Sequence, residues 1–310
     1  MGEKLRAGVI GAGVFGGYHA GKYASLPGVA LAGVYDHHPA HAQALAAKVG
    51  GRVFASEAEL IAAVDVVSIA TPASAHGASA LAALAAGKPT YVEKPIAITP
   101  EDADLIAAAA RRRGLVVACG FLERAGLAAL GLFDIPEPPR LLEAVRVAPR
   151  NARNLDVSVV LDLMIHDLDL ALALNPSSEP LAVEAEGAAI FNATLDVVEA
   201  EADFEDGFVC RFRASRIAEA RERWMRVVYP SGEVRVDFLT HEVTNTTPFP
   251  LDPGFAATPA GRDPLGASIG AFLAAVRGEV EAPLATASDG ARALDLALAV
   301  EQALVQQGLV

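Results

Sequence analysis

The chain has 310 residues, enough for about two domains with sizeable cores, and 53% of its residues are hydrophobic. Its formal net charge of −13 argues against nucleic acid or an anionic membrane as a partner. No uncharged apolar stretch is long enough to span a bilayer and no signal-peptide pattern is present, so we expect a cytoplasmic protein without a membrane partner.

The first predicted element is a strand over residues 6–10, which runs into a glycine-rich turn and then a helix. The turn reads Gly11-Ala12-Gly13-Val14-Phe15-Gly16. Gly11 would permit the tight turn, Gly13 the close approach of a pyrophosphate, and Gly16 the packing of the helix on the strand. Phosphates would then lie at the helix N-terminus, so the pattern predicts a dinucleotide site.

A second predicted strand, residues 29–35, ends in Asp36, twenty residues after Gly16. An acidic residue at this distance is typical of a carboxylate that binds the adenosine ribose. Its charge would repel the 2′-phosphate of NADP, so we expect NAD as the cofactor, with NADP less favoured. His37 and His38 leave an alternative open, since either imidazole would be able to approach a phosphate.

Strand and helix patterns alternate as far as residue 120. The later predicted strands cover residues 66–70, 89–93 and 115–121, and the helices between them cover residues 74–86 and 100–113. Alternation of this kind predicts an α/β fold with a doubly wound parallel (Rossmann) sheet. We therefore expect a dinucleotide-binding domain over residues 1–120.

From about residue 139 the pattern changes to alternation of apolar and polar residues. It is clearest over residues 181–186, 198–204 and 208–213, with turns at 205–207 and 230–232. Such alternation predicts half-exposed antiparallel strands. Residues 121–310 should therefore form an α+β substrate domain with a mainly antiparallel, open-faced sheet, closed by helices near 269–277 and 289–306. An exposed sheet face makes a homo-oligomer the expected state.

The helix predicted around residue 165 carries ionisable side chains among Leu, Met and Ile. Helical spacing puts Asp162, His166 and Asp169 on one face. Burying three such groups is costly unless they are paired or take part in chemistry, so this face indicates the floor of a site. An acidic stripe in contact with solvent is the alternative.

Taken in order, these features resemble the Gfo/Idh/MocA oxidoreductases along the whole chain. The glycine turn and Asp36 are followed by Ala70-Thr71-Pro72 with His76, then by Glu93-Lys94-Pro95, and finally by the Asp162 helix. The resemblance implies a cofactor site formed by Gly11, Gly13, Val14, Phe15, Gly16, Asp36, Ala70, Thr71, Pro72, His76, Glu93 and Lys94. It also implies that Lys94 is the active-site lysine, with Asp162 and His166 as its catalytic partners and Asp169 near the substrate.

Two departures from the family pattern concern the substrate contacts. Ser158-Val159-Val160 replaces the usual glycine pair before the aspartate helix, and Ala125-Gly126-Leu127 stands where many members carry an aromatic and a polar residue.

The predicted position of Lys94 agrees with a catalytic role, because doubly wound sheets bind ligands at the carboxyl ends of their strands. Oxidation of a sugar hydroxyl needs a base for its proton and a cation beside the developing alkoxide. We assign His166 as the base and Lys94 as the cation, while Asp162 would orient the imidazole or hold a neighbouring hydroxyl. The reverse assignment, with Lys94 as the base and His166 as an anchor, stays open.

A finer resemblance, to the UDP-N-acetylglucosamine 3-dehydrogenase branch, rests on the short length and on residues 121–124, 159–169 and 214–216. It implies a sugar-nucleotide substrate and a keto-sugar product. A diphosphate favours guanidinium partners, for which we select Arg124 and Arg153. Arg150 and Arg216 are further candidates, although a surface position is the simpler interpretation for both.

Other functions remain open at this stage: dehydrogenation of a free sugar or an inositol, glycoside cleavage with NAD but no net redox change, nucleotide sensing without turnover, and metal-dependent catalysis. We expect no metal. His37, His38 and His41 follow the ribose aspartate at a predicted helix start, which favours solvent exposure, and Cys119 and Cys210 have no zinc-site spacing.

Overall fold

The computed structural model describes residues 4–150 and 157–306, which form two compact units. The first unit joins the residues up to 125 with residues 263–291, and the second joins residues 126–262 with those from 292 onward. This grouping differs from a single division at residue 120 because a helix late in the chain, α9 (Pro264–Val276), packs into the core of the first unit.

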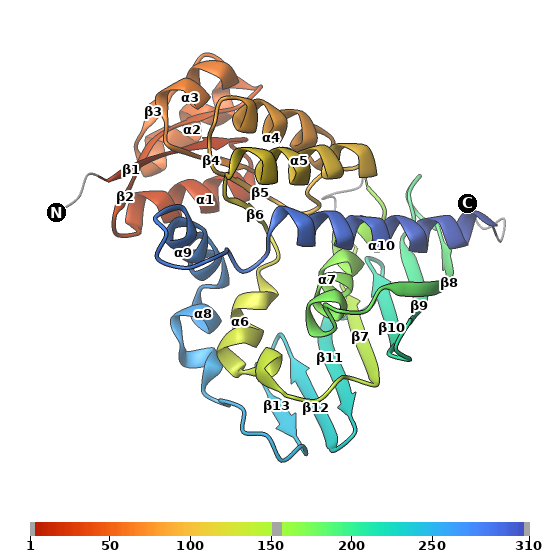
Figure 1. Ribbon diagram of the computed structural model, residues 1–310. Helices are drawn as coiled ribbons and strands as arrows, with labels where there is room; N and C mark the ends of the chain where they lie inside the picture. The colour runs from red at the N-terminus through yellow and green to blue at the C-terminus, as the bar shows by residue number, and fades with distance from the viewer. Residues whose placement is uncertain (1–3, 151–156, 307–310) are drawn as a thin grey trace. The chain divides into compact units, whose positions relative to one another are not determined.

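The first unit contains six parallel strands: β1 (Leu5–Ile10), β2 (Val29–Tyr35), β3 (Arg52–Val53), β4 (Val66–Ile69), β5 (Thr90–Val92) and β6 (Val117–Cys119). Their order in the sheet is β3-β2-β1-β4-β5-β6 (Figure 1). The predicted doubly wound α/β fold is confirmed. Because β1 lies between β2 and β4, and β4 lies beside β5, the carboxyl ends of these four strands adjoin at one edge of the sheet.

Helices cover both faces of this sheet. The remaining helices of the unit are α1 (Val14–Ser25), α2 (Pro39–Val49), α3 (Glu57–Ala63), α4 (His76–Ala85) and α5 (Pro100–Arg113). On one face α1, α2 and α9 enclose a core that contains Tyr23, Tyr91 and Phe272. On the other face α3 approaches the sheet so closely that a Cβ on Gly8 would lie 2.5 Å from Leu60.

The ends of α5 show why its bounds were predictable from the sequence. Thr99 caps the N-terminus by accepting a hydrogen bond from the Asp102 amide, and Pro100 occupies the first turn. Gly114 ends the helix in the left-handed conformation at φ 61°. Among the described helices, none is long and apolar enough to cross a membrane.

The second unit contains a seven-stranded sheet formed by β7 (Leu141–Val147), β8 (Pro180–Ala188), β9 (Val197–Phe204), β10 (Val209–Ser215), β11 (Glu222–Tyr229), β12 (Gly232–Asp237) and β13 (Val243–Asn245). The order is β13-β12-β11-β7-β10-β9-β8, and only the β7–β10 pair is parallel. A mainly antiparallel sheet was predicted here and is confirmed.

The helices that accompany the second sheet begin with α6 (Glu123–Leu130), whose first residues belong to the first unit. A π-helical turn over Val160–Met164 leads into α7 (Ile165–Leu174), which packs on β7 and β10, and α8 (Pro259–Arg262) is a single turn. The last helix, α10 (Ala287–Gln306), contributes residues to both units.

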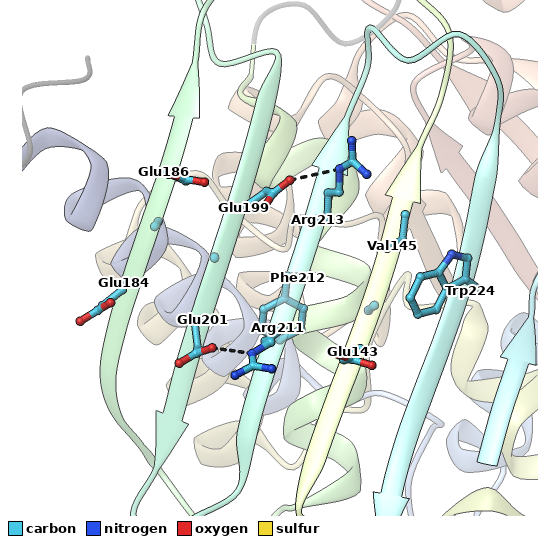
Figure 2. A pocket seen from close by; sticks show the side chains of 13 residues that line it. Glu143, Val145, Glu184, Glu186, Glu199, Glu201, Arg211, Phe212, Arg213 and Trp224 are labelled. Atoms are coloured by element: carbon cyan, nitrogen blue, oxygen red, sulfur yellow. Dashed lines mark hydrogen bonds and ion pairs between the residues drawn. The ribbon is translucent and has the colours of Figure 1, made fainter. Parts of the chain in front are cut away.

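The two faces of the second sheet differ as the alternating sequence predicts. Along β10, Cys210 and Phe212 are buried, whereas Arg211 and Arg213 point outward. On the outward face Arg211 pairs with Glu201 at 2.6 Å and Arg213 with Glu199 at 3.2 Å (Figure 2). The second sheet therefore has an exposed face of paired charges.

A buried ion pair joins α7 to this sheet. Arg146 of β7 donates hydrogen bonds to both carboxylate oxygens of Asp167, at 3.0 and 2.8 Å. Their side chains are only 2% and 4% exposed. Because a buried charge without its partner is strongly destabilising, this pair fixes the first turn of α7 on the sheet.

We predict that Arg146→Met lowers the free energy of unfolding by about 3–5 kcal/mol, because it leaves the Asp167 carboxylate buried without its partner. Urea denaturation followed by the fluorescence of Trp224, the only tryptophan of the chain, measures this change in the same sheet. The control is Arg213→Met, whose exposed pair should contribute less than about 1 kcal/mol. Equal effects of the two substitutions would contradict the assigned role of Arg146.

Candidate functional site

Backbone hydrogen bonds link the predicted cofactor residues along the carboxyl edge of the first sheet. The Gly11 amide donates to Tyr35 O at 2.8 Å, the Ala70 amide to Ile10 O at 2.8 Å, and the Glu93 amide to Ile69 O at 3.0 Å. Residues that are far apart in the sequence thus follow one another across β2, β1, β4 and β5. The structure brings the glycine turn, Asp36, the Thr71 turn and Glu93-Lys94 to one edge.

The glycine turn has the geometry that the sequence predicts. Gly11 has φ +96°, a conformation that favours glycine, and a Cβ on Gly16 would lie 1.8 Å from Gly11 O. A Cβ on Gly13, by contrast, would meet nothing within 4 Å. Open space therefore adjoins the Gly13 backbone.

These features fit a dinucleotide. Gly13 is the N-cap of α1 and provides no side-chain cap, so the first amides of the helix remain available to a phosphate. Beside this turn, Thr71 Oγ1 is buried and has no hydrogen-bond partner among the described residues. An unpaired buried hydroxyl and an uncapped helix end are both features that a bound polar ligand would satisfy.

Asp36 is held in place by the turn. One of its oxygens accepts a hydrogen bond from the Ala12 amide at 2.6 Å and the other from the His38 amide at 2.8 Å. His41 Nδ1 lies 3.6 Å from the carboxylate, and the His37, His38 and His41 side chains are exposed, as the sequence analysis expected. A partly buried carboxylate, with the His41 imidazole beside it, directly follows the end of β2.

Exposed apolar side chains lie next to the glycine turn. Val14, Phe15 and Tyr18 in the first turns of α1 are 47%, 43% and 55% exposed, and the Phe15 and Tyr18 rings are 5.9 Å apart. Val14 and Phe15 were predicted to contact the cofactor, whereas Tyr18 was not singled out. Adjoining exposed apolar groups of this size are typical of a surface that a ligand covers.

His76 connects two of the loops at this edge. Its Nδ1 lies 2.6 Å from Pro95 O and its Nε2 lies 2.9 Å from Thr71 O. Burial holds the pKa of His76 below its usual value, against the opposing effect of the two carbonyls. A neutral ring has a single N–H, so it donates to one of these two carbonyls and lies against the other, between the Thr71 turn and the segment that carries Lys94.

Glu93 points into the protein, whereas Lys94 is partly exposed. Glu93 Oε1 lies 2.8 Å from Nε2 of His19, a fully buried residue of α1 that the sequence analysis missed. Burial alone would raise the pKa of Glu93, but the His19 hydrogen bond and the positive charges nearby, including Lys94, outweigh it and lower the pKa. Glu93 is therefore an ionised group in the interior.

In the second unit, Asp162 and His166 are the partly exposed members of the predicted stripe. Asp162 lies in the π-helical turn and His166 in the first turn of α7. Asp169 is completely buried and Asp167 forms the pair with Arg146, so the charged face is divided between surface and interior. Single π-helical turns are frequent at functional sites.

The arginines chosen for a diphosphate have different positions. Arg124 is 8% exposed and donates to Leu284 O at 3.1 Å and to Asp289 at 3.3 Å, which favours a structural role. Arg216 is also buried, beside Asp196 at 3.2 Å, which corrects the surface position preferred for it. Arg150 is exposed and stacks on Phe191 at 4.7 Å, and Arg153 lies outside the described residues.

No group of three or more His, Cys, Asp or Glu side chains within the described ranges is arranged to hold a metal ion. Cys119 and Cys210 are both buried.

Comparisons with known proteins agree with the cofactor edge. Residues 5–121 match the model of the Gfo/Idh/MocA family, an oxidoreductase family with an NAD-binding Rossmann fold. The chain is 40% identical over 280 residues to the UDP-N-acetylglucosamine 3-dehydrogenase of Acidithiobacillus ferrooxidans, covering 88% of each protein. A solved structure of that enzyme, GnnA, matches with a TM-score of 0.86 and 36% identity over 97% of both chains.

More distant relatives act on other polyols. An inositol 2-dehydrogenase of Cereibacter sphaeroides is 33% identical over 175 residues, which cover 54% of this chain and 52% of that enzyme. A scyllo-inositol dehydrogenase of Lactobacillus casei, solved with NAD(H) and scyllo-inositol, has a TM-score of 0.81 at 20% identity over 98% of each chain. The second likeness extends to the fold alone.

We predict that Gly13→Ala weakens dinucleotide binding by at least about tenfold while leaving the fold intact, because the new methyl group enters only the space proposed for the pyrophosphate. Calorimetric titration with NAD and thermal unfolding without ligand measure the two effects. Gly21→Ala, in the same helix and also in open space, should change neither. Unchanged NAD affinity in Gly13→Ala would remove this turn from the cofactor site.

Proposed function

This chain belongs to the Gfo/Idh/MocA oxidoreductases, and we propose that it is an NAD-dependent dehydrogenase that converts a hydroxyl of a sugar nucleotide into a ketone. The proposed substrate resembles UDP-N-acetylglucosamine. The observation that carries this substrate is the 40% identity to a UDP-N-acetylglucosamine 3-dehydrogenase, which extends over both units instead of the cofactor-binding part alone.

The preference for NAD is also a proposal, and it rests on Asp36. The carboxylate is fixed by two backbone amides at the end of β2, so it is unable to turn away from a ligand without losing both hydrogen bonds. A fixed negative charge repels a 2′-phosphate and accepts hydrogen bonds from ribose hydroxyls. We expect Asp36 to favour NAD on both grounds.

NAD held at the glycine turn and Asp36 would supply a hydride acceptor for the substrate carbon. His166 takes the proton of the reacting hydroxyl, as a partly exposed imidazole in the first turn of a helix is able to do. Lys94 provides a positive charge for the developing alkoxide. Asp162 orients His166 or holds an adjacent hydroxyl, and Arg153 stays a proposed substrate contact. Arg124 is left out because of its internal bonds, and Asp169 because it is completely buried.

The inositol relatives provide the second candidate, dehydrogenation of a free polyol, because they match more than half of the chain. A glycosidase that uses NAD without net redox change is a third. The homo-oligomer also stays a proposal, and it rests on the exposed face of the second sheet (Figure 2). Analytical ultracentrifugation measures that state.

The function is tested by following NADH absorbance with UDP-N-acetylglucosamine, free N-acetylglucosamine and myo-inositol, each with NAD and with NADP. We expect NADH formation with the sugar nucleotide, a lower rate with NADP, and little with the other two substrates. Faster oxidation of inositol would overturn the substrate. A product sugar without net NADH would point to the glycosidase, and equal or better use of NADP would overturn the role of Asp36.

The roles of Lys94 and His166 are separated by their pH profiles. A histidine base works only when neutral, so the wild-type oxidation rate should rise with pH through one ionisation that His166→Asn abolishes. Lys94→Ala should reduce kcat by at least about a hundredfold with little effect on NAD affinity. If His166→Asn raises KM and keeps the ionisation, His166 is an anchor and Lys94 becomes the base.

A further inference from the structure

A chain of buried polar side chains lies behind Glu93 and takes no part in the reaction proposed above. Tyr23 OH lies 2.7 Å from Ser68 Oγ, which lies 3.0 Å from His19 Nδ1, and His19 Nε2 lies 2.8 Å from Glu93 Oε1. Tyr23, Ser68 and His19 have no exposed surface, and Glu93 is 6% exposed. We call these four residues the Glu93 network.

The hydrogen bonds of the Glu93 network are all satisfied by one arrangement of protons. Glu93 is ionised and only accepts, so His19 Nε2 carries the proton and donates to it. With a single ring proton, His19 Nδ1 accepts from the Ser68 hydroxyl, which in turn accepts from Tyr23. Burial raises the pKa of Tyr23, which keeps its phenol protonated as this arrangement requires.

The surroundings of the Glu93 network hold the carboxylate in one place. A Cβ on Gly120 would lie 2.8 Å from Glu93 Oε2, so there is no room for the carboxylate to move in that direction. The His19 ring packs edge-on against Tyr91 at 5.1 Å. With His19 on one side and Gly120 on the other, the negative charge has a fixed position at the end of β5.

Lys94 directly follows this fixed charge in the chain. Both residues lie just after β5, where Glu93 is buried and Lys94 is partly exposed, so the backbone that holds Glu93 inside also carries Lys94. The Glu93 carboxylate also attracts the positive charge of Lys94. Both the position of the Lys94 backbone and a nearby negative charge therefore depend on Glu93.

We propose that His19 is a positioning residue: through its hydrogen bond it keeps Glu93 ionised and in place, and through Glu93 it fixes Lys94. The proposal rests on the role of Lys94 given above. This role is separate from the packing of α1. Without the His19 hydrogen bond, the burial of Glu93 would favour its neutral acid form. Lys94 would then lose its fixed counter-charge.

The test compares His19→Leu, which removes the donor, with His19→Gln, whose amide retains an N–H for Glu93, and with Gly21→Ala as a control in the same helix. The first measurement needs no substrate. Each protein is treated with limiting acetic anhydride over a range of pH, and mass spectrometry gives the acetylation rate of Lys94 relative to the exposed Lys48.

We expect Lys94 to be acetylated at least about threefold faster in His19→Leu at a given pH, because its amine is no longer held by the attraction of a fixed Glu93 carboxylate. His19→Gln should restore most of the wild-type rate, and Gly21→Ala all of it. An unchanged Lys94 rate in His19→Leu, or equal rates in the Leu and Gln variants, would overturn the proposal.

The second measurement is steady-state kinetics with the sugar nucleotide. His19→Leu should lower kcat at least about tenfold, because Lys94 is displaced from the reacting hydroxyl. KM and the Kd for NAD should change by less than about threefold, because binding is intact. If His19→Leu does not fold, Glu93→Gln removes the same charge at constant size and should raise Lys94 acetylation equally. If the wild-type protein does not oxidise the sugar nucleotide, the proposed substrate is wrong. The acetylation measurement, which needs no substrate, still tests the positioning role of His19.

Discussion

A carboxylate buried at the end of a parallel strand has to be paired, and this requirement organises the first unit around Glu93. Its partner His19 lies in α1, and the other ring nitrogen of His19 contacts the Ser68 hydroxyl of β4. Ser68 in turn contacts Tyr23, which lies in α1 one turn after His19. The same helix offers its uncapped N-terminus at Gly13 to a phosphate. The glycine turn and the Lys94 segment are therefore fixed to each other by one buried charge.

The second unit follows the same rule with a different pair. Asp167 enters the interior and meets Arg146, which fixes the first turn of α7 on β7. A second buried pair, Arg216 with Asp196, lies close to the residues that precede this helix, because Arg216 also donates to Val157 O. Backbone amides and the Asn192 side chain outweigh burial and lower the pKa of Asp196, so this anchor stays charged at neutral pH. The π-helical turn that carries Asp162 therefore follows a segment whose backbone is held by the Arg216–Asp196 pair.

Local signals predicted most of the fold, because alternation, caps and glycines act within a few residues of their effects. The bounds of α5 follow from Thr99, Pro100 and Gly114, and β9 was predicted to within one residue at its start. The Glu93 network was missed because its partners are 74 residues apart. A histidine on the apolar face of α1, one turn before Tyr23, was the available signal. No comparable signal placed α9 in the first unit or Asp167 against Arg146, since both depend on contacts between distant segments.

In each unit, a residue proposed to act on the substrate directly adjoins a buried charged residue. Lys94 follows Glu93, and His166 precedes Asp167, so the exposed functional group and its buried neighbour share a peptide bond. A flexible side chain loses conformational entropy each time it is held for reaction, and an adjacent buried charge that is fixed in place removes much of that freedom from the backbone. The buried charges thus have a use that stability alone does not explain, because a buried ion pair often stabilises no more than apolar residues of similar volume.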